Sequence, residues 1–163
     1  MQVQPSGRHP LQTKLVYYKG TEKPPIGGVL CYDIAAPTTP AAGTFDEEVL
    51  GTRCIKPATA NLMLFAGIVI NDEEYQKKVS GAYDGFYRVI SPTKGAMVEA
   101  LVYFATGTAG SSLLKPVDAK WYLGTTSFDV SCVAMLMETG DWSSGGTPAV
   151  DVNVGVKKIV RFV

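Results

Sequence analysis

Histidine is almost absent from this sequence, because His9 is the only one among 163 residues. Catalytic triads need a histidine beside the nucleophile, and the common structural zinc sites need cysteine and histidine at close spacing. The three cysteines, Cys31, Cys54 and Cys132, are widely spaced and form no CxxC pair. We therefore expect no catalytic residue, no metal and no cofactor. We also expect the three cysteines to be reduced and buried.

Charge is also scarce, since charged residues make up only 18% of the chain and the 15 basic and 15 acidic residues cancel. Soluble domains usually carry about 25% charged residues. A net charge of zero provides no field that would concentrate nucleic acid or anionic lipid, so we expect no direct nucleic-acid partner. A surface with so few charges favours a protein that covers much of it with other proteins.

Long hydrophobic runs are missing too. The longest, residues 62–70 within "TANLMLFAGIVIND", is about half of the roughly 20 residues that a membrane-spanning helix needs. Ile68, Val69 and Ile70 are β-branched and favour extended backbone. Gly67 disfavours a helix, and in a strand it often marks a bulge or a close approach of two backbones. The N-terminus has no apolar signal core. We expect a buried strand here, and neither membrane association nor general secretory export.

Short apolar runs separated by turn residues fill the rest of the chain and predict a mainly β fold, as a single-domain β-sandwich or barrel. The clearest two-residue alternation is "VDVNVGV", from Val150 to Val156. "NDEEYQKKV", residues 71–79, is the one short helix that we predict. "GTAGSSLLK", residues 107–115, lacks the Gly-Lys-Ser/Thr of a phosphate-binding loop and is predicted to be a turn. No repeat of fixed period is visible.

The first 13 residues contain two prolines and a glycine that break regular structure, and they predict an extended N-terminal arm before a β domain at 14–163. Such an arm can bind a neighbouring subunit through its apolar anchors and its charge. A second candidate contact is a tryptophan in a long Gly/Ser-rich loop, where it either folds back or docks into a partner. The predicted partner contacts are Val3, Arg8, His9, Leu11 and Trp142.

Three segments follow one another in a recognisable order: "GGVLCYD", then "RCIKP" after a Pro/Thr-rich loop, then "LFAGIV". This succession resembles bacteriophage head decoration proteins, also called cement proteins, over about residues 15–125. The segment after about 127 has no counterpart. The resemblance implies a small β protein on the outer surface of an icosahedral capsid, made in the host cytoplasm. It also implies that the protein binds the major capsid protein, stabilises the shell by bridging its subunits, and forms a homotrimer.

Two alternatives stay open. "GGVLCYDIAAP" is similar to the first motif of trimeric dUTPases, whose aspartate helps to hold magnesium, and "SGAYDGFYRVI" resembles their third motif, with Asp84 in the place of the catalytic aspartate. The serine-containing segment comes in the wrong order, however, and the glycine-rich C-terminal motif is missing. The other alternative is a carbohydrate-binding module that stacks sugars on Trp121, Tyr122 and Trp142.

Overall fold

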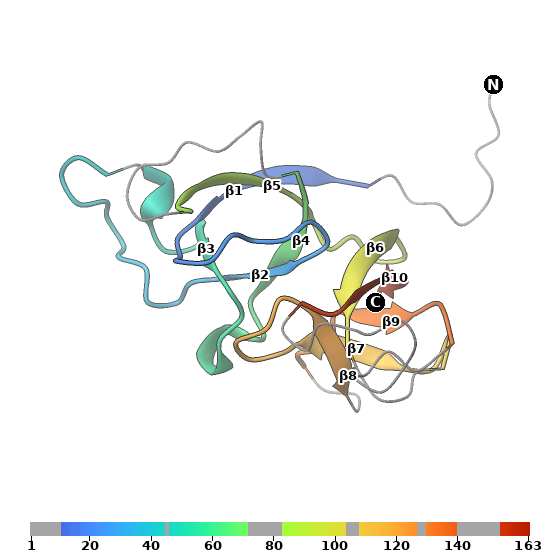
Figure 1. The fold of residues 1–163 in the computed structure, drawn as a ribbon. Helices are drawn as coiled ribbons and strands as arrows, with labels where there is room; N and C mark the ends of the chain where they lie inside the picture. Colours follow the sequence, from blue (N-terminus) through green and yellow to red (C-terminus); the bar gives the residue numbers. More distant parts are fainter. Residues whose placement is uncertain (1–10, 45, 72–82, 104–107, 127–129, 140–153) are drawn as a thin grey trace, which may run out of the picture.

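The computed structural model describes residues 11–44, 46–71, 83–103, 108–126, 130–139 and 154–163, whose strands close into two five-stranded barrels that lie side by side (Figure 1). Barrel A contains β1 (Thr13–Tyr18), β2 (Val29–Tyr32), β3 (Arg53–Ile55), β4 (Phe65–Asn71) and β5 (Gly85–Ile90). Barrel B contains β6 (Met97–Val102), β7 (Leu113–Pro116), β8 (Leu123–Thr126), β9 (Ala134–Leu136) and β10 (Val156–Phe162). Two short 3-10 helices, η1 (Asp46–Glu48) and η2 (Thr59–Asn61), lie in the loops of barrel A. The predicted mainly β fold is confirmed.

The two barrels have the same topology. Around barrel A the order is β1-β3-β2-β4-β5, and around barrel B it is β6-β8-β7-β9-β10, which is the same order for the second set of five strands. In each barrel the first and third strands are parallel, and all other neighbours are antiparallel. The chain thus contains a structural repeat, although its sequence shows none.

The apolar run at residues 62–70 forms β4, as predicted, and it lacks alternation because both faces of the strand are buried. Val69 belongs to the hydrophobic cluster formed mainly by barrel A, whereas Ile68 belongs to the cluster formed mainly by barrel B. A Cβ at Gly67, whose φ is +153°, would collide with the carbonyl oxygen of Ile90. The close backbone approach expected at this glycine is therefore present. The strand begins only at Phe65, after the exposed Met63 and Leu64.

The barrels are joined by backbone as well as by packing. The Leu101 N–H of β6 donates to the Gly27 carbonyl oxygen (2.9 Å), and the Val29 N–H of β2 donates to the carbonyl oxygen of Trp121, just before β8 (3.0 Å). β6 and β8 pair with each other at a single register position. The backbone of Gly27 and Val29, at the beginning of β2, therefore bridges β6 and the residue just before β8, where these two strands of barrel B do not pair with each other.

Some predictions differ from the structure or fall outside its described part. The segment predicted as a turn forms one from Thr108 to Ser112, where the Ser111 and Ser112 N–H groups donate to the Thr108 carbonyl oxygen, but from Leu113 onward it belongs to β7. β10 begins only at Val156, so Val154 and Gly155 of the alternating segment precede the strand, and residues 150–153 of that segment lie outside the described part of the chain. Cys132 is half-buried, so the prediction of three buried thiols is wrong for this residue. Asn71 ends β4, and the rest of the predicted helix, 72–79, lies outside the described residues, as do residues 1–10 of the predicted arm.

No helix among the described residues is long and apolar enough to cross a membrane.

Candidate functional site

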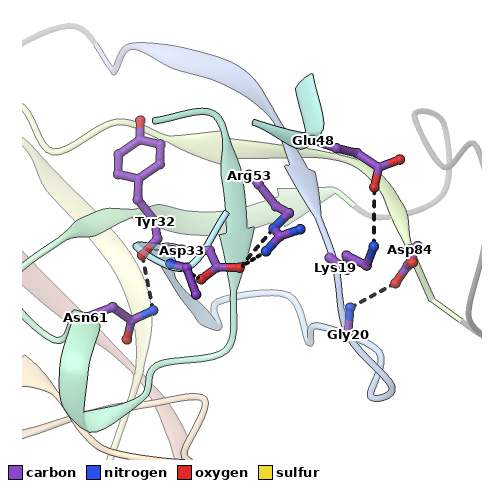
Figure 2. A network of polar contacts seen from close by, with 9 residues as sticks. Lys19, Gly20, Tyr32, Asp33, Glu48, Arg53, Asn61 and Asp84 are labelled. Atoms are coloured by element: carbon purple, nitrogen blue, oxygen red, sulfur yellow. Dashed lines mark hydrogen bonds and ion pairs between the residues drawn. The ribbon is translucent and has the colours of Figure 1, made fainter. Parts of the chain in front are cut away.

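A charged pair at the end of β2 is the centre of a polar network in barrel A (Figure 2). The Arg53 guanidinium donates from Nε (2.8 Å) and Nη2 (2.5 Å) to Oδ2 of Asp33, while the other carboxylate oxygen accepts the Ala35 N–H (2.9 Å). The two backbones are also joined, because the Asp33 N–H donates to the Arg53 carbonyl oxygen at 2.9 Å. Asp33 is only 6% exposed. The pair fixes the chain reversal after β2 against the first residue of β3.

Asn61 is the second organising side chain of this network. It is buried, its Oδ1 accepts the Ala58 N–H (2.6 Å), and its Nδ2 donates to the Tyr32 carbonyl oxygen (3.1 Å). The Tyr32 N–H in turn donates to the Leu64 carbonyl oxygen at 2.8 Å. One amide side chain therefore satisfies a backbone group just before η2 and another at the last residue of β2, and it holds η2 against the end of that strand.

A second group of charges lies around the end of β1. Lys19 forms an ion pair with Glu48 of η1 at 3.3 Å, and the Glu48 side chain is only 5% exposed. Asp84, at the entrance to β5, accepts the Gly20 N–H at 2.9 Å (Figure 2). Burial, and then the negative charges of Glu48 and Asp84, raise the pKa of Tyr17 well above its usual range. This tyrosine is therefore a neutral hydroxyl at any physiological pH.

A cleft of about 300 Å³ lies at the junction of the two barrels, between the loop after β1, the loop after β3 and the turn before β8. Lys56 pairs with Glu22 at 3.0 Å and also lies 5.0 Å from the centre of the Trp121 ring. The Trp121 indole N–H donates to the same Glu22 carboxylate at 3.3 Å. The hydrogen bonds from Lys56 lower the pKa of Glu22. These three side chains satisfy one another and tie barrel A to barrel B.

The polar side chains of this network bind one another and nearby backbone groups. Among them, no three His, Cys, Asp or Glu side chains lie close enough together to hold a metal ion. Asp33 and Asp84, the aspartates of the two dUTPase-like segments, each accept hydrogen bonds that fix a loop. Trp121 and Tyr122 are 3% and 6% exposed, so neither offers an open face for stacking a sugar. Cys31 and Cys54 are fully buried, and burial raises the pKa of each thiol to about 12.

No protein-family model matches this sequence, and no curated protein matches it either.

Of the predicted partner contacts, the structure describes one. Leu11 is 49% exposed and lies just before β1, where the Ser91 N–H donates to the Gln12 carbonyl oxygen at 2.8 Å. The others, Val3, Arg8, His9 and Trp142, lie outside the described residues.

Sequence reasoning did not find the pairing of Asp33 with Arg53 or the role of Asn61. The only signal was an acidic residue directly after an apolar strand, in "VLCYD". Such a residue often begins a turn by accepting a backbone N–H two positions later, as Asp33 does from Ala35.

Proposed function

We propose that this protein is a structural virion protein, a decoration or cement protein that binds the outside of an icosahedral capsid and stabilises it by bridging subunits, as a homotrimer. The segments that carry the resemblance form the framework of barrel A, since "GGVLCYD" contains β2, "RCIKP" contains β3 and "LFAGIV" lies largely in β4. Their polar side chains hold loops in place. The protein would be made in the host cytoplasm and would act on the outer surface of the particle.

The observation that carries this proposal is the apolar end of barrel A, formed by Ile34, Met63 and Leu64. Their exposed fractions are 50%, 65% and 38%. The Tyr32 N–H bond to Leu64 and the buried Asn61 hold these residues on adjacent, fixed loops. Apolar side chains that a rigid scaffold presents to solvent mark protein-binding surfaces. This end suits a contact with another protein better than it suits a small polar substrate.

Co-sedimentation with capsids of the virus that encodes the protein tests this role. We expect the protein to pellet with assembled shells and not with dispersed capsid subunits, and decorated particles to release their genome at a higher temperature than bare ones, because binding only to the assembled state stabilises it. Met63→Lys should weaken binding, whereas Val130→Lys, which also charges an exposed apolar side chain, should not. Equal melting of decorated and bare particles would refute a stabilising role.

The dUTPase alternative predicts a different result. Metal-dependent turnover of dUTP by the purified protein, abolished by Asp84→Asn, would replace the structural proposal with an enzymatic one.

A further inference from the structure

Because the two barrels have the same topology, the same face can be compared in both. In barrel A, the outer face of β2, β4 and β5 carries Val29, Ile68 and Ile90, which are buried in the cluster shared with barrel B. This face of the barrel is already an interface between two barrels.

Barrel B has the same face on β7, β9 and β10, and the described residues include no third barrel that covers it. The registers correspond: Ile68 pairs with Ile90 in barrel A, and Met135 pairs with Arg161 in barrel B. The position one residue further along β4 and β9 confirms the match, since the Gly27 N–H donates to Val69 and the Gly110 N–H donates to Leu136. Arg161 is exposed at the position that Ile90 buries in barrel A.

This exposed surface combines apolar side chains with the cations Lys94 and Arg161, beside the ion pair of Lys157 with Glu99, and we call it the cationic face. Its apolar members, Met97, Ile159 and Val163, are 42%, 38% and 48% exposed, and Met97 lies opposite Arg161 across β6 and β10. A hollow of about 170 Å³ is lined by Lys94, Gly95, Met135, Arg161, Phe162 and Val163. Arginine and methionine beside apolar residues are enriched at protein–protein interfaces.

The charges on the cationic face have no counter-charges in the described part of the chain. There, the side chains of most charged residues form hydrogen bonds or ion pairs, as in Lys157 with Glu99 at 3.6 Å. The exceptions are Lys94 and Arg161 on this face, together with Asp46, Glu47 and Asp118.

Two of the three unpaired acids lie together on barrel A. Asp46 and Glu47 belong to η1, and the same loop carries Leu50, which is 49% exposed; we call Asp46, Glu47 and Leu50 the acidic loop. It therefore presents two anions and an apolar side chain, which complement the two cations and apolar side chains of the cationic face. η1 and β10 lie at opposite ends of the molecule (Figure 1), so the two surfaces cannot meet within one copy.

We infer that the cationic face of one copy binds the acidic loop of a second copy, with Lys94 and Arg161 facing Asp46 and Glu47. The contact is heterologous, because each copy uses a different surface, and it closes into a ring when the rotation between copies permits. This inference deepens the self-association part of the proposed function, and it names the two surfaces that would form the assembly.

Charge reversal tests the contact in solution. Sedimentation velocity across a range of protein concentrations should show association of the natural sequence that weakens as salt rises from about 0.05 to 0.5 M. Arg161→Glu should weaken association about tenfold or more, and so should Asp46→Lys combined with Glu47→Lys. A triple variant that carries Arg161→Glu, Asp46→Lys and Glu47→Lys together should associate again, because the charges of both surfaces are then reversed. Circular dichroism of each variant checks that these surface changes leave the fold intact.

The control is Asp118→Lys, which reverses another unpaired, exposed acid away from both surfaces and should leave association unchanged. A natural sequence that stays monomeric at every concentration overturns the inference, and so does a triple variant that fails to regain association.

Capsid co-sedimentation, run in parallel, separates this contact from particle binding. If Arg161→Glu abolishes particle binding while the natural protein is monomeric in solution, the cationic face serves the shell and not a second copy. If the monomeric variants and the natural protein all fail to bind particles although the natural protein associates, the proposed function fails while the self-association stands.

Discussion

Replacing Arg53 with methionine should destabilise barrel A strongly, because it leaves the Asp33 carboxylate without its main partner. The side chains of Arg53 and Asp33 are 14% and 9% exposed, and two hydrogen bonds join them. Breaking a buried ion pair by removing one partner costs roughly 3–5 kcal/mol, because the remaining charge stays buried and unpaired. Since this pair keeps some contact with solvent, we expect a loss of about 3 kcal/mol.

A loss of that size lowers the melting temperature by about 6–12 °C for a protein of this length. Thermal and urea unfolding followed by circular dichroism measure it. Lys157→Met is the matched control, because Lys157 and its partner Glu99 are 46% and 57% exposed. Exposed pairs contribute about 0–1 kcal/mol, so this variant should melt within a few degrees of the natural protein.

Adding Asp33→Asn to Arg53→Met should recover part of the lost stability, because the amide carries no charge to leave unpaired. A loss below about 1 kcal/mol for Arg53→Met alone, or no recovery in the double variant, would show that the pair does not hold the loop as we argue.

Three further outcomes follow from burial and backbone geometry. Iodoacetamide at pH 8 should label Cys132 and spare the fully buried Cys31 and Cys54, as mass spectrometry of the native protein can show; rapid labelling of all three would contradict their burial. The pKa of about 12 at both buried thiols lies above that of an unfolded thiol, about 8.5. Burial of the two neutral thiols therefore stabilises the fold fully below about pH 8.5, and this stabilisation is lost as pH rises toward 12. The urea midpoint should therefore be lower at pH 10 than at pH 7.5, and an unchanged midpoint would refute this. Gly155→Ala should cost more stability than Gly43→Ala, since both have φ near +84° but only at Gly155 would a Cβ lie 2.6 Å from a carbonyl oxygen; equal melting of the two variants would refute the steric part.

The sequence predicted most strands because short apolar runs between turn residues require extended backbone. β4 was the clearest case, since its run is apolar on both faces and too short for a membrane helix. β7 was missed because its four residues follow two serines and end at Pro116, a combination that also suits a turn. The repeat could not be seen in the sequence because equivalent positions of the two barrels are both buried but carry different residues. Tyr18 and Val102, for example, are buried at the point where the first and third strands of each barrel pair in parallel, and their side chains are unlike.

The polar network could not be predicted from the sequence, for a different reason. Asp33 and Arg53 are 20 positions apart, and only the closing of barrel A brings their side chains together. Asn61 acts on backbone carbonyl and amide groups, which are the same at every residue and therefore carry no sequence signal. The cationic face has a weak signal in the alternation of β10, where Lys157, Ile159 and Arg161 share one side of the strand.

The dependence of barrel B on the beginning of β2 sets an order for folding during synthesis. Barrel A leaves the ribosome first and contains all of its own strands, so it can close before the second half of the chain exists. When β6 and the segment before β8 emerge, Gly27 and Val29 are already in place to receive them through the Leu101 and Trp121 backbone bonds. Barrel A is thus a template on which barrel B is assembled. A circular permutant that begins at barrel B would have to form β6 and β8 before their template had been translated.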